Sequence, residues 1–536
     1  MTTTTSTTAA TERRSRRPHV KIRRARRTQT QEHQRLTEQI LAQGSAAAAA
    51  AQIAAGIIQA QLTDAEIHAW RQDLGARLTT IQQHSEQNLG FIEEQIALAT
   101  KEPMRLLAER AAQAKANATP CQCLKCHLEL LHQKYLARTI DSRFGPLRVF
   151  RKYGWCPACE TWQFPADHAL GLSRNAPASP YVQEMAALLV SKMPPEQAVR
   201  VAQRMGLELS RCTLDREAHR QGLRAETARA AHLSQLDTWE GLQKLSAATE
   251  GPPAQPFTLI IEIDAWNIRE RDDWGQTEEL RAKGEPVSRW HWVYVGTVFR
   301  LDHRAHNASG RALISQRAYA VTRHGVEALI RQLYYQALVC GLGQAKEVLV
   351  IADGALWIWN AVADRFPNAR QRLDLYHGEE HLWSVAHELY GKDTPEAQAW
   401  IDPLLKQLRN DDGPGLISSL KQLQTDLSQK LEEKVQKQID YFHNNAKRMQ
   451  YREILRARKA VNKGNATPEQ ILKANEPLGS GAVESTCRQY QCRFKRTGQF
   501  WSTAGDEALM SLETFWRNGR WHELFLHAKI TSPHLN

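Results

Sequence analysis

The chain has 536 residues and a formal net charge of +12 at pH 7. At the usual domain size, this length predicts about three to five folding units. Hydrophobic residues make up 42% and charged residues 24%, which is typical of a folded protein rather than a disordered one. The longest nearly apolar run, at 45–58, is shorter than the roughly 20 residues that span a bilayer. With no secretion-signal pattern, this argues against a membrane protein, a small disulfide scaffold and a secreted enzyme, and favours the cytoplasm.

Most of the positive charge lies in residues 1–30, which hold nine Lys or Arg and one acid, Glu12. This segment carries 9 − 1 = +8, so the rest of the chain carries only 12 − 8 = +4. Its threonine-rich start and RRSRRPHVKIRRARR have no apolar period, which predicts a disordered basic arm. Such an arm favours a polyanionic partner, most often nucleic acid. The alternative is a tail that only improves solubility.

Residues 31–117 are rich in Ala, Gln, Leu and Glu and almost free of proline. They predict two or three long helices, as in a coiled-coil or oligomerisation element.

Four of the nine cysteines form two pairs with metal-ligand spacing, Cys123-x2-Cys126 and Cys156-x2-Cys159. Between them, TIDSRF and LRVFRKY flank a Gly-Pro turn, which predicts a β-hairpin. Two such pairs at the ends of a hairpin supply the tetrahedral ligands of structural Zn²⁺, so residues 118–170 predict a zinc ribbon. The neighbouring Cys121 and His127 are alternative ligands. Disulfides or ordinary buried thiols are the other interpretations.

Residues 177–230 predict a helix-turn-helix DNA-binding domain. In PPEQAVRVAQRMGLELSRCTLDREAHR a helix begins at Pro194–Glu196, a turn glycine follows at Gly206, and Ser210 begins a second helix. Near the start of that helix lie residues that suit phosphates and base edges in the major groove: Arg211, Thr213 and Arg216. A plain packing unit of three helices is the alternative.

From residue 257 the pattern becomes α/β. The strand candidates are FTLIIEID, HWVYVGTVFRL, RAYAVT, KEVLVIAD and ARQRLDLY, and the amphipathic helices are VEALIRQLYYQAL and GEEHLWSVAHELYG. These segments occupy 257–391. Residues 392–475 are predicted to be helical and highly charged, and 476–536 to form helices with many aromatic and basic residues.

Three acids stand where strands or helices meet turn residues. Asp264 closes the strand IIEID, Asp353 closes VLVIAD before Gly354, and Glu484 follows GSGAV at the start of a helix. Strand ends at one edge of an α/β sheet can bring carboxylates together, and hard divalent ions need such oxygen ligands. Singly, each acid has another explanation, namely a solvent-facing strand end, a turn or cap, and a favourable helix dipole.

Asp374 and His377, in LDLYH, form a further pair near a strand end. They either orient the site, bind a phosphate or reflect local turn chemistry. After Glu484 come residues that suit phosphate binding and base stacking: Arg488, Arg493, Lys495, Arg496 and Trp501.

The order of these features resembles the DDE transposases of bacterial insertion sequences, in particular the ISKra-like group. The segments that carry the resemblance are LVIADGALWIWN, LDLYHGEEHLW and PLGSGAVESTCRQYQCRFKRTGQFWS, within residues 120–525. It implies a multidomain α/β protein whose RNase H-like mixed-sheet core is interrupted by a helical insertion at 392–475. By motif, Asp264, Asp353 and Glu484 match the catalytic acids, and Asp374 with His377 the D-x2-H element. Asp272 and Asp273, in a polar loop, are rivals for the first position.

The resemblance further implies phosphoryl transfer with two Mg²⁺ ions, or Mn²⁺, held by the three acids. The expected partner is double-stranded DNA, both transposon ends and target, bound by a homodimer or higher oligomer associated with the bacterial nucleoid. Two rival functions remain at this point. One is a zinc-ribbon DNA-binding regulator derived from a transposase without cleavage activity, and the other is a nuclease with the same core that joins no strands.

Overall fold

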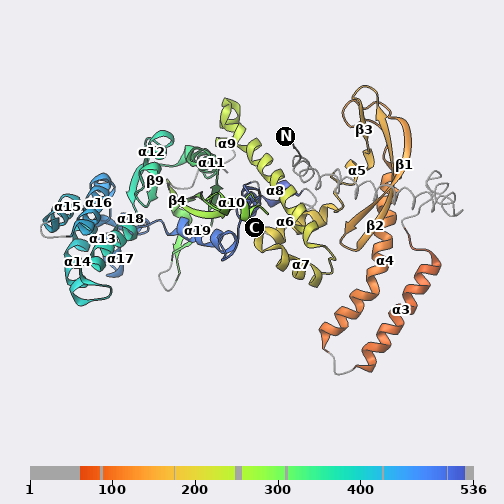
Figure 1. Ribbon diagram of the computed structural model, residues 1–536, viewed down its shortest axis with the longest axis horizontal. Helices are drawn as coiled ribbons and strands as arrows, with labels where there is room; N and C mark the ends of the chain where they lie inside the picture. The colour runs from red at the N-terminus through yellow and green to blue at the C-terminus, as the bar shows by residue number, and fades with distance from the viewer. Residues whose placement is uncertain are drawn as a thin grey trace, which may run out of the picture. The chain divides into compact units, whose positions relative to one another are not determined.

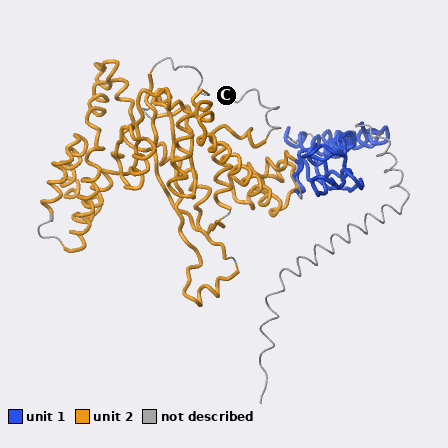
Figure 2. The backbone as a smooth tube through the Cα atoms, turned by 90° about the horizontal axis from the view of Figure 1, so that it is seen from above, with its two compact units in different colours: residues 1–179 blue, residues 180–536 orange. Residues whose placement is uncertain are grey.

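The structure, a computed structural model, describes residues 61–84, 88–173, 176–247, 256–273, 275–307, 312–424, 428–503 and 505–525. The chain forms two compact units, residues 1–179 and 180–536, which Figure 2 draws in different colours. The predicted basic arm at 1–30 and the first part of the predicted helical region lie outside the described residues. None of the described helices has the length and apolar character needed to cross a bilayer.

The first unit begins with two long helices that lie side by side, α3 (Asp64–Gln83) and α4 (Leu89–Ala118) (Figure 1). A capping box starts α3, because the side chains of Thr63 and Glu66 each accept the other's backbone N–H. Arg110 of α4 forms an ion pair with Glu66 at 2.5 Å, which links the two helices.

A three-stranded antiparallel sheet follows, formed by β1 (Leu131–Ser142), β2 (Gly145–Cys156) and β3 (Thr161–Gln163), and α5 (Pro165–Ala169) comes next. The hairpin turn lies at Arg143 and Phe144, because Ser142 pairs with Gly145. Short β3 covers only the end of β2, and α4 satisfies part of the remaining edge. Gln113 donates to the carbonyl of Phe150 at 2.9 Å and accepts its N–H at 2.8 Å.

The second unit begins with three helices, α6 (Pro180–Lys192), α7 (Pro195–Arg204) and α8 (Arg211–Ser234). Gly206, in a left-handed conformation at φ +77°, follows α7, and Ser210 Oγ accepts the N–H of Thr213 at 3.1 Å to cap α8. The sequence therefore correctly indicates two helices joined by a short turn. The helix α9 (Trp239–Ala247) precedes the sheet.

The central sheet has five strands in the order β10-β9-β4-β5-β8. Their bounds are β4 (Thr258–Glu270), β5 (Arg289–Arg300), β8 (Ala318–Thr322), β9 (Glu347–Ala352) and β10 (Arg370–Leu373). β4, β9 and β10 are parallel, whereas β5 is antiparallel to both β4 and β8. The fold is thus mixed α/β. The helix α10 (Thr277–Ala282) lies between β4 and β5, and β6 (Arg304–His306) pairs with β7 (Ala312–Ile314).

Helices cover both faces of this sheet. On one face, α11 (Val326–Val339) and α12 (Leu356–Arg365) pack on the alternate residues Leu259, Ile261 and Ile263 of β4. The other face carries α19 (Gly481–Phe494), and Figure 1 shows it across β4 from α11 and α12. Because side chains alternate between the faces of a strand, residues 260, 262 and 264 point toward the α19 side. After α19, α20 (Asp506–Arg517) packs against α8 and β8, and α21 (Trp521–Leu524) ends the described chain.

Within the described residues, five helices between β10 and α19 share one core, and a sixth packs beside them to complete a lobe. The five are α13 (Leu375–Tyr390), α14 (Pro395–Arg409), α15 (Gly413–Lys421), α16 (Gln429–Asn445) and α17 (Arg452–Asn462), and α18 (Pro468–Ala474) packs against α17. Figure 1 shows them gathered together. The described residues of the predicted helical segment at 392–475 are mostly helical, and α13, which the sequence groups with the sheet, also contributes to this core. The two ends of the lobe meet where Leu375 N donates to Leu478 O at 3.1 Å.

Candidate functional site

Three aspartates stand in a row across the parallel strands. Ile263 of β4 pairs with Ala352 of β9, and Ala352 pairs with Leu373 of β10. The next residue of each strand is an aspartate, so the sheet places side by side Asp264, Asp353 and Asp374. The N–H of Asp374 continues this ladder by donating to the carbonyl of Ala352 at 2.8 Å. The register therefore places the three aspartates side by side. The sequence predicted that Asp264 closes its strand, but β4 continues to Glu270, so Asp264 lies in the middle of β4, beside the points where β9 and β10 end.

Asp264 lies partly buried on the α19 face of β4. Burial raises the pKa of its carboxyl group, and the nearby charge of Asp353 acts in the same direction. A hydrogen bond with the thiol of Cys487, one turn beyond Glu484 on α19, and the charge of His377 act in the opposite direction. The carboxyl group of Asp264 therefore interacts with the residue that follows β9 and with side chains of α13 and α19.

Asp353 begins a tight turn that leads into α12. Its Oδ1 accepts the N–H of Ala355 at 3.0 Å, and its carbonyl accepts the hydroxyl of Tyr441 at 2.8 Å. Gly354 has φ +95°, and a Cβ there would lie 2.8 Å from side-chain atoms of both Leu373 and Tyr441. Only glycine fits this turn without displacement, which fixes the position of Asp353 relative to β10 and α16.

Glu484 lies in the first turn of α19 and is half-buried. Burial raises its pKa, and the charges of Asp374 and Asp264 add to this effect, while His377 and Arg488 oppose it. The charge of Glu484 on α19 therefore interacts with those of Asp264 and Asp374.

Two buried carboxyl groups hold the start of α19 against the sheet. Glu262, two residues before Asp264 on the same face of β4, accepts the N–H of Val483 at 2.8 Å and is 1% exposed. Burial raises the pKa of Glu262 to about 8. The sequence shows only that Glu262 shares a face with Asp264. Its pairing with the helix N-terminus depends on the fold.

Asp374 is the second of these carboxyl groups, and its contacts contradict the interpretation that it binds a phosphate. Its side chain is fully buried and accepts the N–H groups of Tyr376 and His377 at 2.7 and 3.1 Å, capping α13. It also accepts the N–H and the hydroxyl of Ser480 at 2.6 and 2.5 Å. With these partners Asp374 positions the loop before α19 and has no access to a phosphate. His377, in the first turn of α13, remains partly exposed beside the acids.

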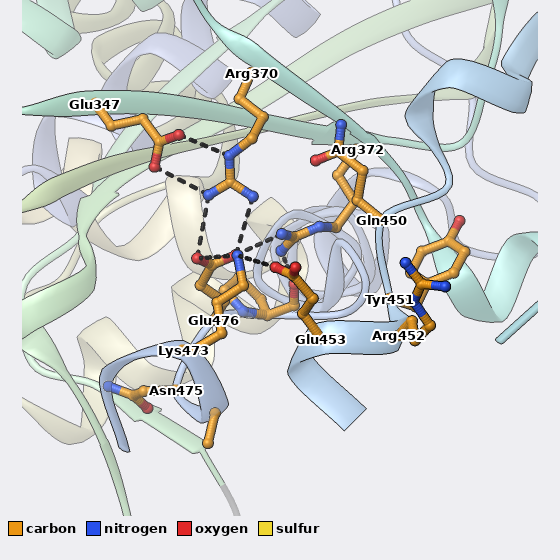
Figure 3. A network of polar contacts seen from close by, with 12 residues as sticks. Glu347, Arg370, Arg372, Gln450, Tyr451, Arg452, Glu453, Lys473, Asn475 and Glu476 are labelled. Carbon is orange, nitrogen blue, oxygen red and sulfur yellow. Dashed lines mark hydrogen bonds and ion pairs between the residues drawn. The ribbon is translucent and has the colours of Figure 1, made fainter. Parts of the chain in front are cut away.

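A network of ion pairs fastens the end of the lobe to the edge of the sheet (Figure 3). Arg370 of β10 lies between Glu347 and Glu476, with bonds of 2.7 to 3.1 Å. The buried Arg372 donates to the carbonyl of Pro477 at 2.8 Å and also contacts Glu476. Although burial opposes it, hydrogen bonds from Arg370 and Arg372 lower the pKa of Glu476 to about 2. The chain thus returns to the sheet just before the glycine–serine loop and α19.

The basic residues after Glu484 divide into two groups. Arg488, Lys495 and Arg496 are exposed. The guanidinium group of Arg493 is buried and donates to the carbonyl of Val190 at 2.8 and 3.1 Å. Trp501 is also buried, and its indole N–H donates to the carbonyl of Phe494 at 2.8 Å. We therefore leave Arg493 and Trp501 out of the DNA-contact set, because their side chains hold α19 and the following loop in place.

The predicted contacts at the start of α8 lie at the surface. Arg211 and Arg216 are exposed, although Arg211 forms an ion pair with Glu196 of α7 at 2.8 Å. The hydroxyl of Thr213 bonds to Ser210 Oγ at 2.9 Å as part of the helix cap.

The four paired cysteines of the first unit form a cluster that could hold a metal ion. The sulfur atoms of Cys123, Cys126, Cys156 and Cys159 lie within 4.8 Å of one another. Individual S···S distances are 3.5, 3.7 and 3.8 Å. Four thiolates about 2.3 Å from a tetrahedral Zn²⁺ lie about 3.8 Å apart, whereas a disulfide is much shorter. These cysteines can therefore hold a metal such as zinc, and the alternative ligands Cys121 and His127 are not part of the cluster.

Further contacts support this assignment. The backbone N–H of Lys125 donates to Cys123 Sγ at 3.4 Å, and the side-chain amide of Gln163 donates to the same sulfur at 3.2 Å. Hydrogen bonds from the backbone of Cys126 and Lys125 lower the pKa of Cys123, whereas hydrogen bonds among the neighbouring sulfur atoms raise the pKa of Cys126 and of Cys159. A thiolate is the form that binds metal.

The three carboxylates of Asp264, Asp353 and Glu484 are less tightly grouped than the cysteines. Within the described part of the chain, the cysteine cluster is the one group of three or more such ligands with all donor atoms inside 4.8 Å. The acids interact through their charges without meeting this distance.

A family model matches the part of the chain that carries most of this site. It is that of the uncharacterised protein family UPF0236, and it matches residues 304–524. The match includes Asp353, Asp374, His377 and Glu484, and it begins after β4 and β5, so Asp264 lies outside it. No curated protein matches the chain.

Proposed function

We propose that the protein is a metal-dependent DNA transposase of the DDE type with an RNase H-like core. The observation that carries this proposal is geometric. The strand register places Asp264 beside Asp353, and the hydrogen bond from Val483 to Glu262 holds the helix that carries Glu484 against the same face of β4. The strand order of the sheet and the position of α19 on one of its faces agree with such a core.

The donor set fits hard divalent cations such as Mg²⁺ or Mn²⁺. Burial and neighbouring carboxylates raise the pKa values of Asp264 and Glu484, so their charged forms are costly as the residues stand. Asp264, Asp353 and Glu484 would hold such a cation, and its charge would offset this cost. The cation would supply an activated water or 3′-hydroxyl and charge stabilisation for the leaving oxygen.

The remaining residues then have positioning roles. Glu262 and Asp374 fix the first turn of α19, and thereby Glu484, against β4 and β10. His377 faces the acids from α13, and its charge opposes the raised pKa of Asp264 and Glu484. Exposed Arg488, Lys495 and Arg496 offer cations to the phosphate backbone near the acids. The helices α7 and α8 would bind transposon-end DNA through the predicted contacts at the start of α8.

The decisive experiment is a cleavage and strand-transfer assay with Mg²⁺ or Mn²⁺. The substrate is DNA that carries terminal inverted repeats, which are first identified in the DNA that flanks the gene. We expect Asp353→Asn and Glu484→Gln to abolish cleavage and to leave end binding largely intact. A matched control is Asp272→Asn, since Asp272 is exposed and bonds to the backbone and hydroxyl of Thr503 rather than to the acids.

The same assay separates the rival functions. Binding without cleavage by the wild-type protein would leave a DNA-binding regulator, and cleaved but never joined products would leave a nuclease. Cleavage by Asp353→Asn at the wild-type rate would refute the assignment of the acids.

A further inference from the structure

Two large aromatic side chains are exposed on the sheet beyond the acidic site. Trp290 and Trp292 of β5 are 59% and 53% exposed. Because they are two residues apart on one strand, they project from the same face. Their partners across the sheet are Arg269 and Asn267 of β4. Neighbouring exposed tryptophans on a sheet face indicate a surface that a partner covers.

Two cations lie over the ring of Trp290. The guanidinium carbon of Arg269 lies 5.4 Å from the ring centroid of Trp290 and 4.8 Å from that of Phe500. Lys495 Nζ lies 5.6 Å from the centroid of Trp290 and donates to the side-chain oxygen of Asn267 at 2.8 Å. The surface therefore combines flat aromatic faces with positive charge.

The chain that follows α19 builds one side of this surface. Trp501 N donates to the carbonyl of Arg269 at 3.0 Å, and Arg271 N donates to the carbonyl of Trp501 at 2.8 Å. This pairing places Phe500 beside the edge of β4. The loop between Lys495 and Trp501 thus joins the helix that carries Glu484 to the surface that carries the two tryptophans.

The surface lies within reach of the acids. Asn267 and Arg269 follow Asp264 on β4 by three and five residues, or about 10 and 17 Å at 3.3 Å per residue. Asp264 projects from the opposite face of β4. Since β9 ends beside Ile263 and the Trp501 bridge begins at Arg269, the intervening edge of β4 is not paired by either.

We propose that Trp290 and Trp292, flanked by Arg269 and Lys495, bind an unpaired DNA strand that leaves the acidic site. The proposal rests on the proposed function, because cleavage of a DNA end frees such a strand. Aromatic faces stack on any base, and Arg and Lys contact the intervening phosphates, so the surface binds without sequence preference. A double helix keeps its bases stacked inside and cannot use the rings in this way.

The test is the affinity of the full-length protein for a fluorescein-labelled dT15 strand, measured by fluorescence anisotropy in EDTA so that no cleavage occurs. Stacking contributes about 1–3 kcal/mol per base, so Trp290→Ala and Trp292→Ala should each weaken binding roughly 5- to 150-fold. The Phe variants at the same positions keep an aromatic face and should bind within a few-fold of wild type. The matched control is Trp239→Ala in α9, which removes a 74% exposed tryptophan elsewhere in the same unit.

Two results would overturn the inference. One is binding of dT15 by the double alanine variant as tight as that of Trp239→Ala. The other is an equal loss of affinity for a 15-base-pair duplex, which would show that the rings do not select an unpaired strand. The cleavage assay separates this inference from the proposed function. If the alanine variants lose dT15 binding but the wild-type protein never cleaves DNA, the strand-binding surface is supported and the transposase proposal is rejected. If the alanine variants bind dT15 as the wild type does and cleavage requires Asp353, the transposase proposal is supported and the strand-binding surface is rejected.

Discussion

The side-chain carboxyl group of Glu262 accepts the backbone N–H of Val483 at 2.8 Å, joining the middle strand of the sheet to the first turn of the helix that carries Glu484. Both partners are buried, so neither has water as a substitute. Glu262 thus determines where Glu484 lies relative to Asp264, although Glu262 is not part of any motif found in the sequence.

Replacement of Glu262 should separate positioning from metal binding. In Glu262→Ala the N–H of Val483 loses its acceptor, which costs about 1–3 kcal/mol of unfolding free energy. Glu262→Gln keeps an acceptor oxygen and should retain most stability and cleavage. Urea unfolding and the cleavage assay measure both effects. If the Gln variant were as inactive as Asp353→Asn while remaining folded, Glu262 would be acting as a ligand instead.

The turn at Gly354 makes a second prediction. Gly354→Ala forces a Cβ to within 2.8 Å of Leu373 and Tyr441 and places a side chain at φ +95°. We expect a loss of at least about 1–3 kcal/mol of unfolding free energy. Gly343→Ala is the control, because a Cβ there meets no atom within 4 Å and its φ lies outside the left-handed region. Equal melting temperatures for the two variants would contradict the turn's requirement for glycine.

Loss of a cysteine ligand should affect zinc binding and the fold of the cysteine module. Elemental analysis of protein purified without chelator should find one zinc per chain. Cys123→Ser and Cys156→Ser should lose that zinc and make residues 121–163 sensitive to protease, because a structural zinc contributes folding energy to its module. Cys212→Ser, which changes an exposed cysteine outside the cluster, should keep the metal. Full zinc occupancy in Cys123→Ser would exclude this ligand set.

Acid should release the network around Glu476. Its pKa of about 2 in the folded protein lies below the ordinary value of 4.5. A depressed carboxyl pKa stabilises the fold above the unfolded value, and that stability is lost as the pH falls from about 4.5 toward 2. A shift of this size corresponds to about 3 kcal/mol. Glu476→Gln should therefore lower the melting temperature at pH 7 and narrow its difference from wild type at pH 3.

The control for this network is Glu453→Gln. Glu453 is 75% exposed and only 4.0 Å from Lys473, so its loss should change little at either pH. A difference between wild type and Glu476→Gln that is the same at pH 3 and pH 7 would show that ionisation of Glu476 does not stabilise the fold.

The sequence predicted the strands that contain or precede Asp264 and Asp353, because an apolar run is a local signal, and at Asp353 the following glycine marks the turn. It did not predict that β4 continues past Asp264 to Glu270, because polar residues interrupt the apolar run after Asp264 and the pairing of this stretch with β5 depends on the fold. It also predicted the cysteine cluster, since the ligand spacing is local within each pair. It did not predict the burial of Trp501 and Arg493, because an aromatic or basic residue looks the same in sequence whether it faces a base or a neighbouring helix. Whether Asp374 binds a ligand or caps a helix likewise depends on Ser480, more than a hundred residues away.

The hydrogen bond between Leu375 and Leu478 brings the two ends of the helical lobe to one point beside β10. A segment tied at its base in this way can lengthen, shorten or exchange helices while the distance between its attachment points stays constant. The size of the lobe is therefore uncoupled from the placement of Glu484. Related chains could vary the outer helices of this segment and keep the same arrangement of acids, provided that two contacts are retained. These are the hydrogen bond from Tyr441 of α16 to the carbonyl of Asp353 and the anchor of Arg370 and Arg372 to Glu476.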